Sequence, residues 1–245
     1  MTNNQQLYEG KAKIIYRTEQ ENILLTHFKD DATAFNAQKR GQIQGKGEIN
    51  CSISAALFEL LETKGIPTHY LSQSAPNQML VKAVKIIPLE VVVRNIAAGS
   101  LCRQTGLPQG QVLEQPLVEF YFKNDQLGDP LLTYERLLLL DLATPEQVEQ
   151  LKTMALAINQ HLTAFFHSCS ITLVDFKLEF GFDCKQQIIL ADEISPDTCR
   201  LWDETQSDPE AKVMDKDRFR RDLGEVESAY QQVKDRVLAT LGIAT

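Results

Sequence analysis

The sequence lacks a long apolar run, and this absence argues against a membrane protein. The apolar stretch near the middle of the chain, residues 137–140, has only four residues, whereas a helix that spans a bilayer needs about 20. Residues 1–6 are polar and contain no apolar centre of a signal peptide. We therefore expect a cytoplasmic protein with no membrane partner.

Regularly paired cysteines are also absent. No two of the five cysteines stand at Cys-x-x-Cys spacing, and their number is odd. Zinc sites and disulfide frameworks are usually built from such pairs. We therefore expect reduced thiols and no zinc site. The cysteines are Cys51, Cys102, Cys169, Cys184 and Cys199.

The chain has no excess of basic residues. It contains 25 lysines and arginines against 33 aspartates and glutamates, which gives a formal net charge of -8. Non-specific binding to nucleic acid needs a positive field, so nucleic acid is not an expected partner. A small anionic substrate is not excluded, because lysines and arginines can cluster locally.

What is present is the composition of a globular protein: 245 residues, 43% hydrophobic and 24% charged. Strand patterns dominate the first third, and helices flank the later strands. This order predicts an α+β fold, with a small β-rich lobe, a larger α+β lobe and a boundary near residues 82–88. The expected strands cover residues 7–16, 23–28, 79–87, 88–94, 118–122, 171–180 and 187–192, with turns filling the rest of 106–133.

Helices are expected at residues 46–64, after Thr144 and at about 225–241. The first has apolar residues at helical spacing and ends at Gly65. The second begins with a capping box formed by Thr144 and Gln147, with Pro145 at its first position. Its predicted apolar stripe comprises Val148, Leu151, Ala155, Ile158, Leu162 and Phe165.

The strand at residues 171–180 carries the most informative polar pattern. Alternate residues of a strand share a face, so Asp175, Lys177 and Glu179 should line one face while Val174, Phe176, Leu178 and Phe180 pack on the other. If the next strand returns antiparallel, its acidic end at Asp192 lies near this polar face. Such carboxylates suit magnesium whose shell is completed by phosphates. A solvated hairpin with cross-strand ion pairs is an equally good interpretation.

Three other segments are candidate anion sites. A tight turn at Gly10 with two nearby lysines could hold phosphates, although a plain hairpin gives the same pattern. Arg94 and Ser100 flank small residues that would allow close backbone approach, or that simply begin a helix. The polar loop at 192–203 and the mixed charges at 215–222 could contact a substrate; salt bridges at a helix start would also explain the latter.

Six segments together resemble the SAICAR synthetase family. They occur in order across about residues 7–241, and each alone is weak whereas the set is specific. Where the family often has Gly-Ser before an arginine, this chain has Thr198-Cys199. The segments are Tyr8-Glu9-Gly10-Lys11-Ala12-Lys13, the run 92–100 around Arg94, Lys123-Asn124-Asp125 with Asp129-Pro130, the run 173–181, Asp192-Glu193-Ile194-Ser195-Pro196-Asp197 and the run 214–220.

The resemblance implies a fold and a reaction. The fold is ATP-grasp-like, with a nucleotide cleft between a β-rich lobe at residues 1–84 and an α+β lobe at 85–245. The reaction joins L-aspartate to the carboxylate of carboxyaminoimidazole ribonucleotide (CAIR), using ATP and Mg²⁺, and gives SAICAR, ADP and phosphate through an acyl phosphate. A homodimer or larger homo-oligomer is implied. Another ATP-dependent carboxylate–amine ligase, a small-molecule kinase and a non-enzymatic nucleotide-binding protein are the alternatives.

The resemblance also assigns residues by motif. The family often has an Asp or Asn near position 36, so Asn36 is consistent with membership but does not establish it. The catalytic set is Lys13, Asp175 and Lys177; the ATP-binding set is Gly10, Lys11, Ala12, Lys13, Lys82, Glu179 and Asp192; Glu179 and Asp192 are the magnesium ligands; and the substrate-binding set is Arg94, Ser100, Lys123, Asp129, Asp197, Arg200, Lys216 and Arg220.

Overall fold

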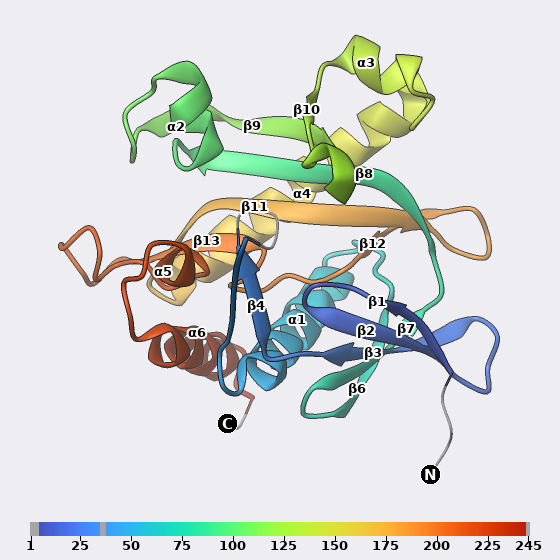
Figure 1. The fold of residues 1–245 in the computed structure, drawn as a ribbon, viewed down its shortest axis with the longest axis horizontal. Helices are drawn as coiled ribbons and strands as arrows, with labels where there is room; N and C mark the ends of the chain where they lie inside the picture. Colours follow the sequence, from blue (N-terminus) through green and yellow to red (C-terminus); the bar gives the residue numbers. More distant parts are fainter. Residues whose placement is uncertain (1–4, 35–37, 244–245) are drawn as a thin grey trace.

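A computed structural model describes residues 5–34 and 38–243, which contain two main antiparallel sheets (Figure 1). Five strands form the first sheet, and the expected meander near the start of the chain is confirmed. Their order in the sheet is β1 (Gln6–Glu9), β2 (Lys13–Arg17), β3 (Ile23–Phe28), β7 (Gln78–Lys82) and β6 (Tyr70–Ala75).

The second sheet has six strands and contains the polar strand singled out above. Its order is β10 (Leu131–Leu132), β9 (Val112–Phe122), β8 (Lys85–Ile96), β11 (Ile171–Phe182) and β12 (Ile188–Ala191), with β13 (Cys199–Asp203) also paired to β11. A bridge between Thr68 and Leu190 links the chain before β6 to this second sheet. A separate hairpin joins β4 (Asp31–Ala34) and β5 (Lys39–Gln42).

Three long helices cover these sheets (Figure 1). Helix α1 (Lys46–Thr63) contacts β3, β6 and β7 and packs beside α6 (Val226–Thr240), whereas α4 (Pro145–Ser168) packs against β8 and β11. One large apolar core runs through all three helices and both sheets. The short helices are α2 (Ser100–Thr105), the 3-10 turn η1 (Asp125–Leu127), α3 (Tyr134–Leu139) and α5 (Asp217–Arg220).

The helix signals in the sequence are confirmed. The Thr144 side chain accepts a hydrogen bond from the main chain of Gln147, whose own side chain accepts one from the Thr144 N–H, so the capping box is present. At the far end of α4 the predicted stripe is displaced by one position. Phe166 is buried in the core there, while Phe165 is only partly buried against it.

Two strand predictions are wrong in extent. Strand β9 spans Val112–Phe122, not only 118–122, and its first half is largely exposed, so it carries no apolar alternation that could have revealed it. The expected strand at 79–87 is divided, because β7 ends at Lys82 and β8 begins at Lys85. Strand β8 runs through Pro88, where the β8–β11 register shifts. A proline lacks the N–H for a regular ladder and fits such an irregularity.

The predicted packing of β11 is correct except at Val174. Phe176, Leu178 and Phe180 lie in the main core, whereas Val174 packs in a separate small cluster with Ala98, Trp202 and Val213. The register against β13 shifts between Leu173 and Asp175. Such a bulge inserts one extra residue into the strand, and simple alternation fails across it.

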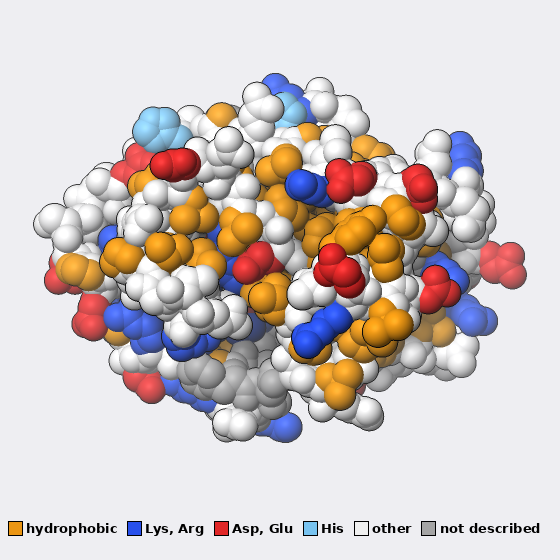
Figure 2. All heavy atoms as spheres, turned by 90° about the horizontal axis from the view of Figure 1, so that it is seen from above, with side chains coloured by type: hydrophobic (Ala, Val, Ile, Leu, Met, Phe, Trp, Pro, Cys, Tyr) orange, Lys and Arg blue, Asp and Glu red, His pale blue; other side chains and the backbone are white. Residues whose placement is uncertain are grey.

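Exposed apolar side chains gather on the side that carries β9 and α3. Figure 2 views this side from above and shows apolar atoms between the charged groups. Among the described residues, no helix is long and apolar enough to cross a membrane. The exposed apolar residues of β9, β10, α3 and the residue after α3 include Val112, Leu117, Leu131, Tyr134, Leu139 and Leu140.

Candidate functional site

A cleft of about 1260 Å³ lies between the two sheets and collects most of the polar residues discussed above. Its lining comes from β1–β3 and β7 on one side and from β8, β11 and the loop after β12 on the other. All of the site residues predicted from the sequence line this cleft. Asn36 lies outside the described residues.

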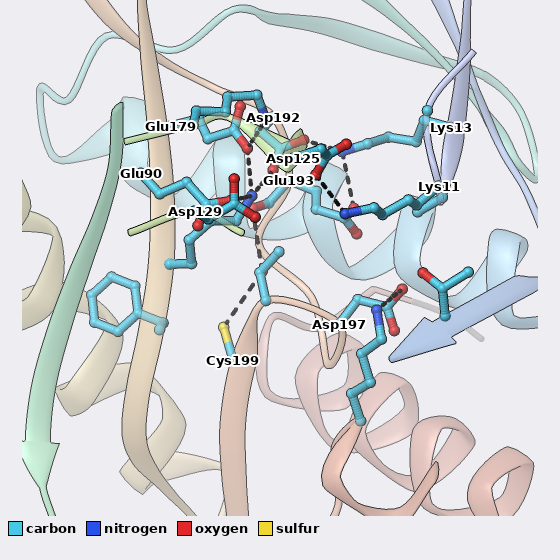
Figure 3. A pocket seen from close by; sticks show the side chains of 18 of the residues that line it. Lys11, Lys13, Glu90, Asp125, Asp129, Glu179, Asp192, Glu193, Asp197 and Cys199 are labelled. Atoms are coloured by element: carbon cyan, nitrogen blue, oxygen red, sulfur yellow. Dashed lines mark hydrogen bonds and ion pairs between the residues drawn. The ribbon is translucent and has the colours of Figure 1, made fainter. Parts of the chain in front are cut away.

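Lysines and carboxylates form a dense network in the middle of the cleft (Figure 3). Lys13 on β2 forms ion pairs with Asp192 and, at 2.9 Å, with Glu193, so it connects the first sheet with the end of β12. Lys177 on β11 has its Nζ 2.5 Å from Glu179 and 2.7 Å from Asp192. We call Lys13, Lys177, Glu179, Asp192 and Glu193 the carboxylate–lysine network.

Burial and opposite charges compete within this network. Burial favours the neutral form of each group, but the carboxylates of Asp192 and Glu193 outweigh it and raise the pKa of Lys13. Likewise, burial opposes ionisation of Asp192, yet Lys13 and Lys177 hold the pKa of that carboxyl well below its usual range. The raised pKa of Lys13 and the lowered pKa of Asp192 therefore keep this ion pair charged at neutral pH.

The same network fits a cation bound by two carboxylates. Glu179 pairs in register with Ala191, which places Glu179 beside Asp192. The Lys177 ammonium already contacts both carboxylates and shows that one cation can reach them together. In the described part of the chain, no three His, Cys, Asp or Glu side chains form a metal site by themselves. Two carboxylates plus nucleotide phosphates are the ligand set that Mg²⁺ commonly uses.

A second cluster lies where β8, β11 and β13 meet. The Arg94 guanidinium donates to Asp175 at 2.9 Å and to Ser100 at 2.9 Å, and the Arg200 guanidinium donates to the same Asp175 carboxylate at 2.7 Å. We call Arg94, Ser100, Asp175 and Arg200 the arginine cluster. Two arginines and a hydroxyl at one wall of a cleft form a typical phosphate-binding arrangement.

Gly99 allows this arginine cluster to form. Its φ of 56° lies in the left-handed region, and a Cβ there would lie 2.7 Å from the Cζ atom of Arg200. Only glycine combines this backbone conformation with such a close approach. The glycine before Ser100 therefore has a defined geometric reason.

A third group of charges surrounds Asp197. Its carboxylate accepts hydrogen bonds from the fully buried Lys46 at 2.9 Å and from the Tyr230 hydroxyl at 2.8 Å. Lys216 is 3.8 Å from the same carboxylate. Burial, together with the nearby Arg220, lowers the pKa of Lys216 against the opposing effect of Asp197. The ion pair of Lys216 with Asp197 is therefore longer than the 2.9 Å pair that Lys46 forms with the same carboxylate.

The β1–β2 turn lines one edge of the cleft. Gly10 N–H donates to the Lys13 carbonyl, and Lys11 forms a 2.6 Å ion pair across the cleft with Asp125. Lys123 has its Nζ 2.6 Å from Glu179, and Asp129 accepts from the main chain of Asn124. Both lysines of the predicted phosphate turn therefore face carboxylates, Lys13 from a largely buried position and Lys11 from an exposed one (Figure 3).

The inner end of the cleft next to Lys13 is apolar. Leu24 and Val81 are register partners on β3 and β7, and Ile15 lies on the neighbouring β2. The Lys82 ammonium is directed to the Thr68 carbonyl at 2.8 Å, and its main-chain N–H donates to the His69 carbonyl. An apolar wall beside a cationic turn suits a nucleotide, with the base at one end and the phosphates at the other.

Several cleft residues were not predicted from the sequence. Glu90 of β8 is the register partner of Glu179 and lies 3.7 Å from Lys177; as the single acid in an apolar strand, it could have been found by its pattern. Tyr121 gives no comparable signal in the sequence, although its hydroxyl accepts from Arg94 at 3.0 Å. His69 stands in an ordinary sequence context and is buried in the cleft wall.

Comparisons with known proteins agree on one family. The SAICAR synthetase family model matches residues 6–237. A phosphoribosylaminoimidazole-succinocarboxamide synthase of Nostoc punctiforme is 68% identical over 238 residues, covering 97% of each chain. A crystal structure of such a synthase from Ehrlichia chaffeensis has a TM-score of 0.92 at 43% identity and covers 96% of this chain and 99% of its own. A SAICAR synthetase in complex with ADP has a TM-score of 0.90 at 42% identity, with coverages of 95% and 97%.

The buried pair of Lys46 and Asp197 predicts a pH-dependent loss of stability. Burial raises the pKa of Asp197, but Lys216, Lys46 and the Tyr230 hydroxyl outweigh it and lower the pKa below its usual value. A lowered carboxyl pKa stabilises the fold above the unfolded pKa of about 3.9 and loses this contribution as pH falls below it. Asp197→Asn should therefore cost about 3 kcal/mol at pH 7, because it leaves Lys46 buried without a counter-charge.

Urea unfolding from pH 7 down to the lowest pH with a cooperative transition measures this cost. The difference between wild type and Asp197→Asn should shrink as pH falls below about 4. Asp222→Asn is the control, since Asp222 forms an exposed ion pair with Lys39 and should change stability by less than about 1 kcal/mol. A cost for Asp197→Asn no larger than the control would contradict a stabilising role of the buried pair.

Proposed function

The chain belongs to the SAICAR synthetase family, and on this premise we propose that it joins L-aspartate to the carboxylate of CAIR, with ATP converted to ADP and phosphate, in purine biosynthesis. The observation that carries the proposal is one cleft that holds both a carboxylate–lysine network and an arginine cluster. The first suits a magnesium nucleotide, and the second suits the phosphate of a ribonucleotide. A ligase for this reaction needs both sites within one cleft.

The nucleotide is assigned to the β1–β2 side. Its base lies against the apolar wall near Lys82, and its phosphates lie at Gly10, Lys11, Ala12 and Lys13. Glu179 and Asp192 would hold Mg²⁺, which would neutralise charge on the phosphates when bound. The adjacency of the two carboxylates and their shared contact with Lys177 support this assignment.

The ribonucleotide is assigned to the other side of the cleft. Arg94, Ser100 and Arg200 bind its phosphate, supported by their joint arrangement around Asp175. We therefore assign the ring carboxylate to the side of Lys177, which follows Asp175 by two residues on the same face of β11. The remaining substrate contacts, which include those for aspartate, are assigned to Lys123, Asp129, Asp197, Lys216 and Arg220.

The chemistry follows from the weakness of a carboxylate as an acyl donor. ATP first phosphorylates the CAIR carboxylate, and the aspartate amine then displaces phosphate from the acyl phosphate. Lys13 and Lys177 neutralise the negative charge that gathers between the two anionic substrates, while Asp175 orients the arginines at the ribonucleotide phosphate. In such a reaction the protein acts mainly by positioning groups and stabilising charge.

Three further features belong to the proposal. Residues 1–84 and 85–245 form two lobes that share one apolar core and enclose the nucleotide.

A homodimer is supported by the exposed apolar side chains of β9 and α3, such as Val112 and Leu139. The enzyme acts in the cytoplasm, where its nucleotide substrates are found.

Release of ADP by the purified protein tests the function. With magnesium and ATP, release should require both CAIR and aspartate, and SAICAR should form in equal amount. Omission of either substrate should abolish turnover. Release that depends on a different acid or amine would retain the ATP site and contradict the substrate assignment, and no release with any combination would contradict an enzymatic role.

Gly99→Ala tests the ribonucleotide assignment without removing a charge. The added Cβ should displace the Arg200 guanidinium and raise the KM for CAIR about tenfold, the loss expected from one charge-assisted contact. The KM for ATP should change less than about twofold, because ATP binds elsewhere in the cleft.

Gly106→Ala is the matched control. Gly106 lies at the other end of α2 with a φ of 76°, and a Cβ added there would have nothing within 4 Å, so this variant places an alanine at positive φ without the overlap. Both KM values should stay close to wild type. Equal rises in the two KM values for Gly99→Ala would indicate a damaged fold and not a displaced arginine.

A further inference from the structure

Asp217 is a carboxylate to which the proposed function gives no role. It begins α5 and is not among the described residues that line the cleft, so it is not placed to contact a substrate itself. Both of its oxygens nevertheless accept hydrogen bonds from arginines that do line the cleft. Oδ2 accepts from the Nε of Arg200 at 2.8 Å, and Oδ1 accepts from the Nη1 of Arg220 at 2.6 Å. Any effect of Asp217 on a substrate must therefore act through these arginines.

The contacts of Arg200 show what Asp217 contributes. Arg200 belongs to the arginine cluster, where its Nη1 donates to both oxygens of Asp175, at 3.0 Å and 2.7 Å. That contact fixes one end of the guanidinium, whereas Asp217 fixes the Nε atom next to the side-chain stem. The guanidinium also lies against Gly99, where no Cβ would fit. An arginine side chain has considerable rotamer freedom, and contacts at both positions together restrict it to one orientation.

Asp217 can hold an arginine because its own backbone is held. Its main-chain N–H donates to Oδ1 of Asp215 at 2.8 Å, while Oδ2 of Asp215 accepts from the Leu201 N–H at 2.8 Å. Asp215 is fully buried, and Leu201 directly follows Arg200 on β13. One buried carboxylate thus connects the start of α5 to the strand that carries Arg200. The position of Asp217 relative to Arg200 is therefore set by the fold.

The charge of Asp217 matters as much as its position. Burial raises the pKa of this carboxyl, but Arg200 and Arg220 outweigh it and lower the pKa below its usual value. The carboxylate is therefore ionised at neutral pH and reduces the repulsion between the two arginines. Asp175 cannot replace it fully, because Asp175 also accepts from Arg94. Without Asp217, Arg200 would depend on a carboxylate that it shares with another cation.

We propose that Asp217 is a positioning residue for the ribonucleotide, which holds the Arg200 guanidinium in the orientation that binds the phosphate. This inference rests on the proposed function, which assigns that phosphate to Arg94, Ser100 and Arg200. The phosphate is remote from the carboxylate that reacts, so its contacts are equally strong in the ground state and in the transition state. Loss of such a contact raises KM and leaves kcat nearly unchanged.

Steady-state kinetics of Asp217→Asn test this role. Asparagine has nearly the same shape but no charge, and only one of its two terminal atoms can accept a hydrogen bond. We expect the KM for CAIR to rise about tenfold, with kcat and the KM for ATP changed less than about twofold. Asp217→Glu keeps the charge but moves the oxygens by one methylene group, so it should raise the KM for CAIR by a smaller factor. It provides the same test should Asp217→Asn fail to fold.

A second background shows whether Asp217 acts through Arg200. Arg200→Met removes the guanidinium and leaves Asp175 paired with Arg94. Adding Asp217→Asn to this variant should raise the KM for CAIR less than about twofold further, because the group that Asp217 positions is gone. A general structural role of Asp217 would instead multiply the effects of the two substitutions.

Asp203→Asn is the matched control. Asp203 is the last residue of β13 and forms a 2.7 Å ion pair with Arg236, and neither is among the described residues that line the cleft. This variant should lower the thermal midpoint and leave the KM for CAIR unchanged. An unchanged KM for CAIR in the Asp217 variants, equal rises for CAIR and ATP, or multiplied effects in the Arg200→Met background would overturn the role of Asp217. Failure of wild type to form SAICAR would instead overturn the proposed function.

Discussion

The ion pair between Lys13 and Asp192 is the interaction on which the cleft depends. Lys13 belongs to the first sheet and Asp192 follows the last residue of β12, so the pair connects the two walls. Glu193 and Lys177 extend it on either side. Removing one member would leave a buried charge without a partner, which is far more costly than the net gain from the intact pair. The network is therefore a constraint on the geometry as much as a source of stability.

The same constraint explains how one cleft can receive several anions. Each of three cations that face the cleft is held by a carboxylate: Lys177 by Glu179, Arg94 and Arg200 by Asp175. These cations are thus positioned before any substrate binds, and little reorganisation is needed when phosphates arrive. An overall acidic chain can bind anionic substrates because basic residues are concentrated in this one place.

The sequence predicted the local elements well where period and end signals were strong. The capping box at Thr144 and the polar face of β11 are examples. It failed at β9, which is long and mostly exposed and therefore carries no apolar alternation, and at Val174, where a bulge reverses the faces.

The site residues likewise fall into those that the sequence could predict and those that it could not. Residues in contiguous motifs, such as Arg94 and Ser100, could be named from the sequence. His69 could not be named from the sequence, because its place in the cleft depends on main-chain hydrogen bonds. One is to Leu190, which is far along the chain, and the other is to Lys82, which lies on another strand.

The central claim that remains to be measured is that Glu179 and Asp192 hold the metal of the nucleotide. Binding of ADP with and without Mg²⁺, in wild type and in Glu179→Gln, tests it most directly. The account predicts that Mg²⁺ strengthens ADP binding in wild type and that this gain is lost in the variant, whereas the full gain in Glu179→Gln would contradict it.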